Sequence, residues 1–252
     1  GSMVATKVES TTNSAGNDVT LATSAGGIQL VKVSVGELGD INVTSAGAIT
    51  EDGNAATVVS GGGLSLTSVG GIDVDTAVVS ISATATGAGA VVIEESDGVE
   101  LKSVVASDGS ISVSAGGAMV ARKVESATNS AGNDVTLATS AGGVQLVEVS
   151  VGDLGDVSVS SAAQIEGDGT GAVEITGGGL SLMSVGGIDV DTAVGTISAV
   201  ATGAGAVVIE ESDGVELKSV VASDGPISVS AAGAMVATKV ESTTNSAGND
   251  VT

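Results

Sequence analysis

The feature that most constrains the fold is an internal repeat of 116 residues. The sequence MVATKVES at residues 3–10 returns unchanged at 235–242 and with one substitution at 119–126. Residues 3–118 align with 119–234 without a gap and differ at 24 of 116 positions, and residues 235–252 match 3–20 throughout. We therefore divide the chain into a first repeat (3–118), a second repeat (119–234) and the start of a third (235–252), in one continuous array. We expect this array to belong to a longer protein, and we interpret residues 1–2 as a cloning scar.

A shorter period lies inside the long one. Each unit has an alternating apolar segment, a turn of small residues and a second alternating segment. The units of the first repeat start at Asp18, Asp40, Gly63, Ala90 and Ser110, and the next starts at Asp134. Their spacings are 22, 23, 27, 20 and 24 residues, a mean of about 23.

This pattern predicts stacked strands. Alternation over four or five residues is typical of a half-buried strand, and Val, Ile and Thr suit a pleated surface. Gly-Gly, Ala-Gly and Asp-Gly favour tight corners. One such unit cannot bury its apolar face alone, but stacked units can. We predict an all-β fold, a parallel β-helix (β-solenoid) with about five rungs per 116-residue repeat. About 11 rungs spaced ~4.8 Å apart would make a rod on the order of 50 Å long.

The alternation also predicts which side chains fill the interior. The expected inward positions of the first repeat are Val19, Leu21, Ile28, Leu30, Ile41, Val43, Leu64, Leu66, Ile72, Val74, Val99, Leu101, Ile111 and Val113. Differences between the repeats at such positions keep apolar volume, as when Ile28 becomes Val144. The less conservative differences, Thr50 to Glu166, Glu51 to Gly167 and Val58 to Glu174, fall within 41–60. That segment is predicted to be a variable loop with a flanking strand.

A string of immunoglobulin-like sandwiches, one per repeat, is the competing interpretation, because 116 residues is an ordinary length for a sandwich. The chain has no Trp, Tyr or Cys for the core of such a domain. The short period also runs through the junctions near Met119 and Met235 without a linker. The solenoid is therefore favoured.

Composition excludes several classes of function. The chain has no His, Cys or aromatic residue, so a Ser-His-Asp triad and any His- or Cys-ligated metal site are excluded. Seven basic against 30 acidic residues give a net charge of −23, which argues against binding to nucleic acid or to an anionic membrane surface. The apolar runs are far shorter than the roughly 20 residues of a membrane helix, so no membrane insertion is expected.

Two segments carry a family resemblance. DVTLATSAGGIQL at 18–30 and GDINVTSAGAIT at 39–50 resemble the repeats of filamentous-haemagglutinin-like exoproteins, which are adhesin-like beta-strand-repeat proteins of bacteria. The resemblance covers nearly the whole chain and is one of composition and period. It implies a right-handed parallel β-helix, an extracellular or cell-surface location and a role as an adhesin or stalk. Rungs in that family are usually nearer 20 residues, so the resemblance also implies loops in units with a mean of 23 residues and in the 27-residue unit. It carries over no functional residue, because the family shares no catalytic motif.

Acidic groups are the candidates for site residues. They are weak calcium candidates because oxygen-rich turns suit that ion; they are Asp73, Asp75, Glu94, Glu95 and Asp97, with Asp189, Asp191, Glu210, Glu211 and Asp213 in the second repeat. Neither the calcium-binding nonapeptide nor an EF-hand loop is present. The competing interpretation is a solvated acidic surface that keeps a long rod soluble and prevents lateral pairing. Apart from calcium, no cofactor is predicted.

Catalysis is not expected. Paired carboxylates could serve a glycosidase, but a sugar site wants aromatic platforms and near-identical repeats offer no single asymmetric cleft. We predict a stiff rod or stalk within a large cell-surface or secreted protein. The alternative is an adhesive module that binds glycans or neighbouring cells through its loops. The expected partners are other repeats of the same parent chain, and end-to-end self-association through the terminal rungs is a further expectation.

Overall fold

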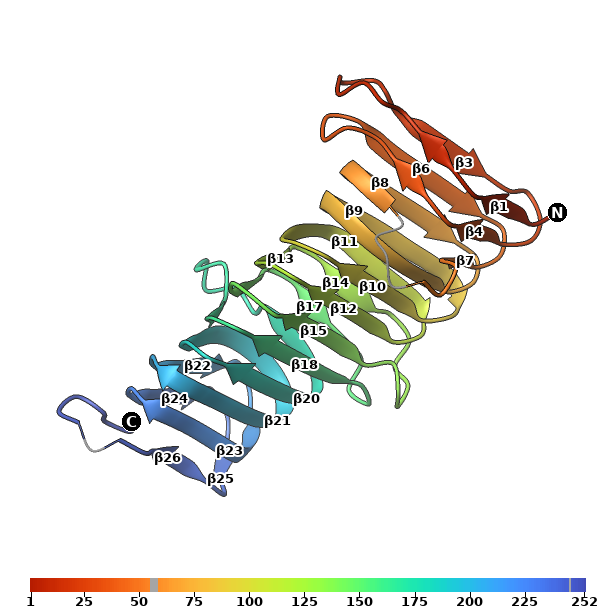
Figure 1. Ribbon diagram of the computed structural model, residues 1–252. Coiled ribbons are helices and arrows are strands. Elements are labelled where there is room, and N and C mark those ends of the chain that lie inside the picture. Colours follow the sequence, from red (N-terminus) through yellow and green to blue (C-terminus); the bar gives the residue numbers. More distant parts are fainter. Residues whose placement is uncertain (55–58, 245) are drawn as a thin grey trace.

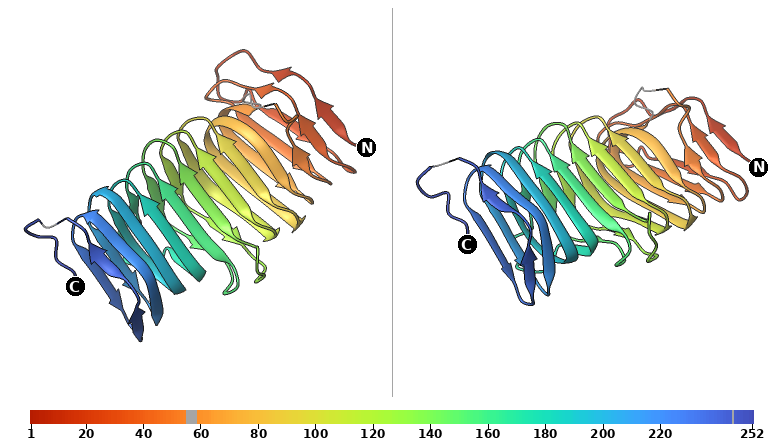
Figure 2. Two further views of the ribbon diagram at one scale, coloured as in Figure 1. Left: turned by 60° about the horizontal axis from the view of Figure 1, so that its bottom comes forward. Right: turned by 90° about the horizontal axis from the view of Figure 1, so that it is seen from below.

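The computed structural model describes residues 1–54, 59–244 and 246–252, and it is a parallel β-solenoid of about 11 turns. The described residues contain strands and connecting turns, with no helix, and therefore no helix that could cross a membrane. Figure 1 shows a rod with the two chain ends at opposite ends, and Figure 2 shows the turns stacked one on the next. The predicted fold class is confirmed.

Short strands separated by small-residue corners make up each turn. The first repeat carries β1 (Met3–Ala5), β2 (Val8–Glu9), β3 (Val19–Ala22), β4 (Ile28–Leu30), β5 (Val33–Ser34), β6 (Asp40–Ser45), β7 (Ile49–Thr50), β8 (Val59–Ser68), β9 (Ile72–Ala88), β10 (Val91–Glu95), β11 (Val99–Asp108) and β12 (Ile111–Ala115). The second carries β13 (Met119–Ala121), β14 (Val124–Ser126), β15 (Val135–Thr139), β16 (Val144–Leu146), β17 (Val149–Ser150), β18 (Asp156–Ser161), β19 (Ile165–Glu166), β20 (Ile175–Ser184), β21 (Ile188–Ala204), β22 (Val207–Glu211), β23 (Val215–Asp224) and β24 (Ile227–Ala231). The third begins with β25 (Met235–Ala237) and β26 (Val240–Ser242).

All described ladders between these strands are parallel, and the repeat boundary does not interrupt them. β12, at the end of the first repeat, pairs with β10 behind it and with β15 of the second repeat ahead of it. An immunoglobulin-like sandwich requires antiparallel sheets in separate domains. The sandwich alternative is therefore wrong, because each strand obtains its partners from the neighbouring turns.

The interior holds the predicted apolar side chains. Of the expected inward positions, all are buried except Val19 and Leu21, which are half-buried. Their counterparts Val135 and Leu137 are fully buried. β3 lies in the first turn and pairs with β6 ahead of it, whereas β15 is paired on both sides, with β12 and β18. The difference between the repeats is thus an effect of position along the rod.

The prediction that the 27-residue unit needs a loop is wrong. β9 is a continuous strand of 17 residues that bends around the solenoid and pairs with β8 from Val59↔Thr76 to Ser68↔Ala85. The partners in this ladder are 17 residues apart, so this turn is the shortest of the first repeat. This turn contains no inserted loop, because β9 continues through the corner of the solenoid as a strand.

Each repeat makes about five and a half turns, in agreement with the predicted value of about five. The ladder that contains Val19 passes through Ile41, Leu64, Ile81 and Leu101 to Ala121, which is five turns in 102 residues. The repeat has 14 further residues, and the next turn, from Ala121 to Leu146, takes 25. One repeat therefore makes five turns and about a half. Equivalent segments consequently lie on opposite sides of the rod, as the protruding turns near residues 11–18 (red) and 127–134 (green) show in Figure 2.

Glycine at two equivalent corners allows these turns to stack closely. Gly26 and Gly142 have φ values of 77° and 81°. This is the left-handed region, which costs other residues energy. A Cβ atom on Gly142 would lie 2.8 Å from the backbone nitrogen of Ala118 in the preceding turn. Glycine is thus required at this position both by the left-handed backbone of the corner and by the close approach of Ala118.

Candidate functional site

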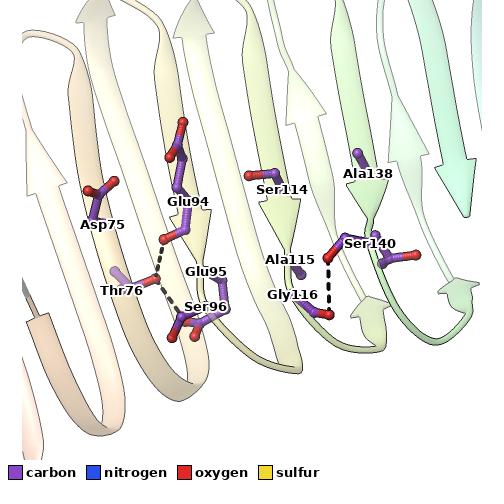
Figure 3. Close-up of a pocket in the computed structure, with 11 residues that line it drawn as sticks. Asp75, Thr76, Glu94, Glu95, Ser96, Ser114, Ala115, Gly116, Ala138 and Ser140 are labelled. Carbon is purple, nitrogen blue, oxygen red and sulfur yellow. Dashed lines mark hydrogen bonds between the residues drawn. The ribbon is translucent and has the colours of Figure 1, made fainter. Parts of the chain in front are cut away.

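The predicted acidic residues of the first repeat lie on two successive turns. Asp73 and Asp75 are on β9, and Glu94 is on β10 directly beside Asp75 in the ladder. Asp73 pairs with Val92, so it lies two residues along the strand from Asp75, the partner of Glu94. Figure 3 shows the carboxylates of Asp75 and Glu94 on the same surface of the solenoid. The sequence pattern therefore brings like charges together along the rod axis.

This proximity affects the ionisation of Asp75. Burial raises the pKa of its carboxyl, and the negative charges of Glu94, Asp73 and Asp52 raise it further. In the second repeat, burial and the charges of Glu210, Asp189 and Asp168 raise the pKa of Asp191 in the same way. The acidic row formed by Asp73, Asp75 and Glu94 is therefore a region of mutual repulsion, as is its counterpart in the second repeat.

Glu95 does not belong to the solvated surface that the sequence suggested. Its side chain is only 4 % exposed. Its Oε2 accepts hydrogen bonds from the Thr76 hydroxyl at 2.8 Å and from the Val78 backbone N–H at 3.1 Å, and its Oε1 accepts one from the Asp97 N–H at 3.3 Å. Figure 3 shows the contact between Thr76 and Glu95. Glu211 makes the same three contacts in the second repeat.

A change in the shape of the turn explains this buried carboxylate. Residues 76–78 of β9 stack on β8, but in the following turn β10 ends at Glu95 and pairing resumes only at Glu100↔Ser80. The residues between form a corner instead of a strand. Glu95 therefore supplies the acceptor that a backbone carbonyl would supply in a regular ladder. Its role is structural, and it holds a short turn onto a longer one.

Burial raises the pKa of Glu95 and of Glu211. The hydrogen bonds from Thr76 and Val78 favour the charged form of Glu95 and oppose that shift, whereas the side chain of Asp97 raises it. The strand alternation contained the signal for this position: Val91 and Ile93 point inward, so the period of two places Glu95 inward as well. Sequence reasoning missed it by treating Glu94 and Glu95 as one acidic cluster.

A second buried carboxylate is confined to the second repeat. Glu174 is 3 % exposed, and its Oε2 accepts a hydrogen bond from the Asp191 N–H at 2.6 Å. Burial raises its pKa. It borders a cavity of about 340 Å³ whose polar lining includes Gln145, Glu166, Asp168, Asp189 and Asp191. Its first-repeat counterpart, Val58, lies outside the described residues, as does part of the predicted variable loop. In the second repeat, residues 167–174 do form a loop between β19 and β20.

These carboxylates do not converge on one point. Among residues 1–54, 59–244 and 246–252, no group of three or more acidic residues is arranged to hold a metal ion. The carboxylates of Glu95 and Glu211 are occupied by protein donors, which include the backbone N–H groups of Asp97 and Asp213 in the adjoining corners. Calcium binding stays a prediction, and its open candidates are Asp73, Asp75, Glu94 and Asp97 with their counterparts in the second repeat.

Six of the seven basic residues lie in surface ion pairs. Glu9 contacts Lys7 at 3.0 Å and Lys32 at 2.9 Å, which links two successive turns. Lys123 bridges Glu125 and Glu148 in the same manner. Such exposed pairs contribute little to stability. They do disperse the positive charge, so most of the surface stays acidic.

Comparison of the chain with protein-family models, with curated proteins and with solved structures gives no match.

Proposed function

We propose that this chain is a structural segment of a large bacterial cell-surface or secreted protein, in which it acts as a stiff rod or stalk. The observation that carries the proposal is the continuity of the ladders through the boundary between the repeats. Because every turn is bonded to the next along the rod axis, added repeats lengthen the rod without introducing a hinge. The single apolar core, which runs from Ala5 to Ile227, supports the same conclusion.

The surface also suits this role. A net charge of −23 keeps copies of the rod apart in solution and opposes lateral sheet pairing. The resemblance of residues 18–30 and 39–50 to filamentous-haemagglutinin-like repeats supports the extracellular location. No catalytic role is part of this proposal, because the chain has no His, Cys or aromatic residue and its acidic rows are repeated.

Small-angle X-ray scattering on this chain and on a version with one more 116-residue repeat tests the rod. Each repeat adds about five and a half turns, so the maximum dimension should grow by roughly 26 Å at ~4.8 Å per turn. The cross-sectional radius should stay constant. A growing cross-section, or an unchanged length, would show that the repeats fold back on one another and would refute the rod.

An adhesive function is the second candidate, because 13 of the 24 differences between the repeats fall at 41–60 and their counterparts. The corresponding loop at 167–174 is largely exposed. Immobilised chain should then bind selected glycans or bacterial cells in a saturable manner, and replacement of 167–174 by a short Gly-Ser loop should abolish binding. The same measurement with calcium and with a chelator tests whether the acidic rows contribute. Absence of binding in all conditions would refute the adhesive function and leave the rod as the proposed function.

A further inference from the structure

An exposed apolar patch lies on one face of the second repeat. Figure 1 shows β18, β20, β21 and β23 close together there, and their ladders join four successive turns. Met183 of β20 is 56 % exposed and pairs with the half-buried Val200 of β21, which pairs with the half-buried Val221 of β23. Val185, which follows β20, is 53 % exposed. We call Met183, Val185, Val200 and Val221 the apolar patch.

The first repeat has polar side chains at the centre of the equivalent face. Thr67 and Thr84 stand where the second repeat has Met183 and Val200, and the two threonines also pair with each other. Both differences replace a hydroxyl side chain by an apolar one, at neighbouring positions of adjacent strands. Contiguous exposed apolar surface marks sites of interaction in soluble proteins. The two differences therefore indicate a contact surface in the second repeat.

The surroundings of the apolar patch are uncharged, although the chain has a net charge of −23. The outward-facing residues beside the patch on the same four strands are small and polar: Ser158, Ser160, Ser181, Ser198 and Ser219. On this face of the four strands, charges lie only at one margin, at Asp156 and in the ion pair of Glu216 with Lys218. Asp189 and Asp191 belong to a different ladder, between β21 and β22. A surface that covers the patch must therefore be flat and uncharged as well.

We propose that the apolar patch is covered by the same patch of a second copy of the chain, in a face-to-face dimer with two-fold symmetry. This face meets both requirements, and contact through it brings no acidic row against another. A two-fold axis between β20 and β21 places Met183 of each copy against Val200 of the other. Packed sheets lie ~10 Å apart, which exceeds the screening length of ~8 Å at 0.15 M salt. The carboxylates on the remaining faces are therefore screened, and the association is strengthened by salt.

The size of the face indicates a weak dimer. Four turns at ~4.8 Å and strands of about six residues at ~3.3 Å give a face on the order of 400 Å² per copy. A stable protein–protein interface buries about 800 Å² per partner. The dimer should therefore form only at high protein concentration. The acidic surface still opposes lateral approach through the other faces of the rod.

Sedimentation velocity over a range of concentrations up to about 500 µM, at 0.15 M salt and above, tests the proposal. The unchanged chain should pass from monomer to dimer. Met183→Asp puts a carboxylate at the centre of the contact and should weaken dimerisation at least about ten-fold. The matched control is Thr67→Asp, which adds the same charge at the equivalent position of the first repeat and should change dimerisation by less than about two-fold. A monomer at every concentration and salt would overturn the proposal, as would equal weakening by the two variants.

A mixing experiment tests the two-fold arrangement itself. Val200→Lys should also weaken dimerisation, because it buries an amine against Met183 of the other copy. An equimolar mixture of Met183→Asp and Val200→Lys chains should dimerise at least about ten-fold more tightly than either variant alone, because the new carboxylate then faces the new amine. A mixture no tighter than its components would overturn this arrangement. Retention of a monomeric chain on an immobilised neutral glycan, lost in Met183→Asp but not in Thr67→Asp, would identify a glycan in place of the second copy and overturn the dimer.

Discussion

Replacement of Glu95 by alanine tests the claim that a side chain substitutes for a missing strand. The buried Val78 N–H donates to Glu95 Oε2 and would lose its acceptor, and an unsatisfied buried donor costs about 1–3 kcal/mol. The Thr76 hydroxyl also contacts the Glu94 carbonyl oxygen, so it retains an acceptor. Removal of a buried carboxyl whose pKa is raised relieves part of its desolvation cost. We expect a net loss of about 2 kcal/mol in the free energy of unfolding around this turn.

Hydrogen exchange at the Val78 amide measures this effect where it arises. A loss of ~2 kcal/mol corresponds to roughly 30-fold faster exchange. Glu94→Ala is the matched control, because Glu94 is exposed and lies beside Asp75, so its removal should leave exchange at Val78 within about 2-fold. Urea unfolding of the same variants gives the change in the free energy of global unfolding. An unchanged exchange rate at Val78 in Glu95→Ala would refute the claim that the Glu95 side chain takes the place of a backbone acceptor.

Three further predictions follow from pKa shifts, corners and core positions. Burial raises the pKa of Glu95 above its ordinary 4.5, so the extra stability of the protonated form is full below that value and is lost as pH rises through the folded-state pKa. Tm should therefore fall as pH rises through that interval, and it should fall less steeply in Glu95→Gln. A left-handed φ costs a residue other than glycine about 1–2 kcal/mol. Gly142→Ala should lower the free energy of unfolding by more than this, because its Cβ atom also meets Ala118. Gly132→Ala, where φ is 96° and the surrounding space is open, should lose only that amount, as measured by urea unfolding. Leu137→Ala should cost about 2–5 kcal/mol, and the same change at the half-buried Leu21 should cost clearly less; equal losses would contradict the end effect.

The sequence predicts the fold well because one local rule is applied many times. Alternation assigns Ile41, Val43, Leu64 and Leu66 to the interior, and each is buried. The same rule fails at Leu21 only because burial requires a turn on both sides, which local patterning does not describe. The period of two also contained the inward position of Glu95, but a charged side chain next to Glu94 was interpreted as surface.

The lengths of the individual turns were harder to predict from the residues. Similar motifs recur at Gly63 and Ala90, and their spacing suggests one long rung. The ladder instead pairs Gly63 with Ser80, because an extended strand can turn a corner without a glycine loop. The path of the whole turn determines which strands pair with each other. The candidate site has the same limitation, since the cavity near Glu174 depends on residues from three successive turns.

The half turn left over in each repeat has a consequence for any longer array. Features that recur once per repeat, such as the protruding turns near residues 11–18 and 127–134, face alternately in two opposite directions. Successive copies of a feature are then about 26 Å apart along the axis, and copies on the same side are roughly 50 Å apart. A ligand bound by every repeat would be presented on both flanks. Such a rod is suited to bridging two opposed surfaces, whereas an array with a whole number of turns would present all its contacts to one.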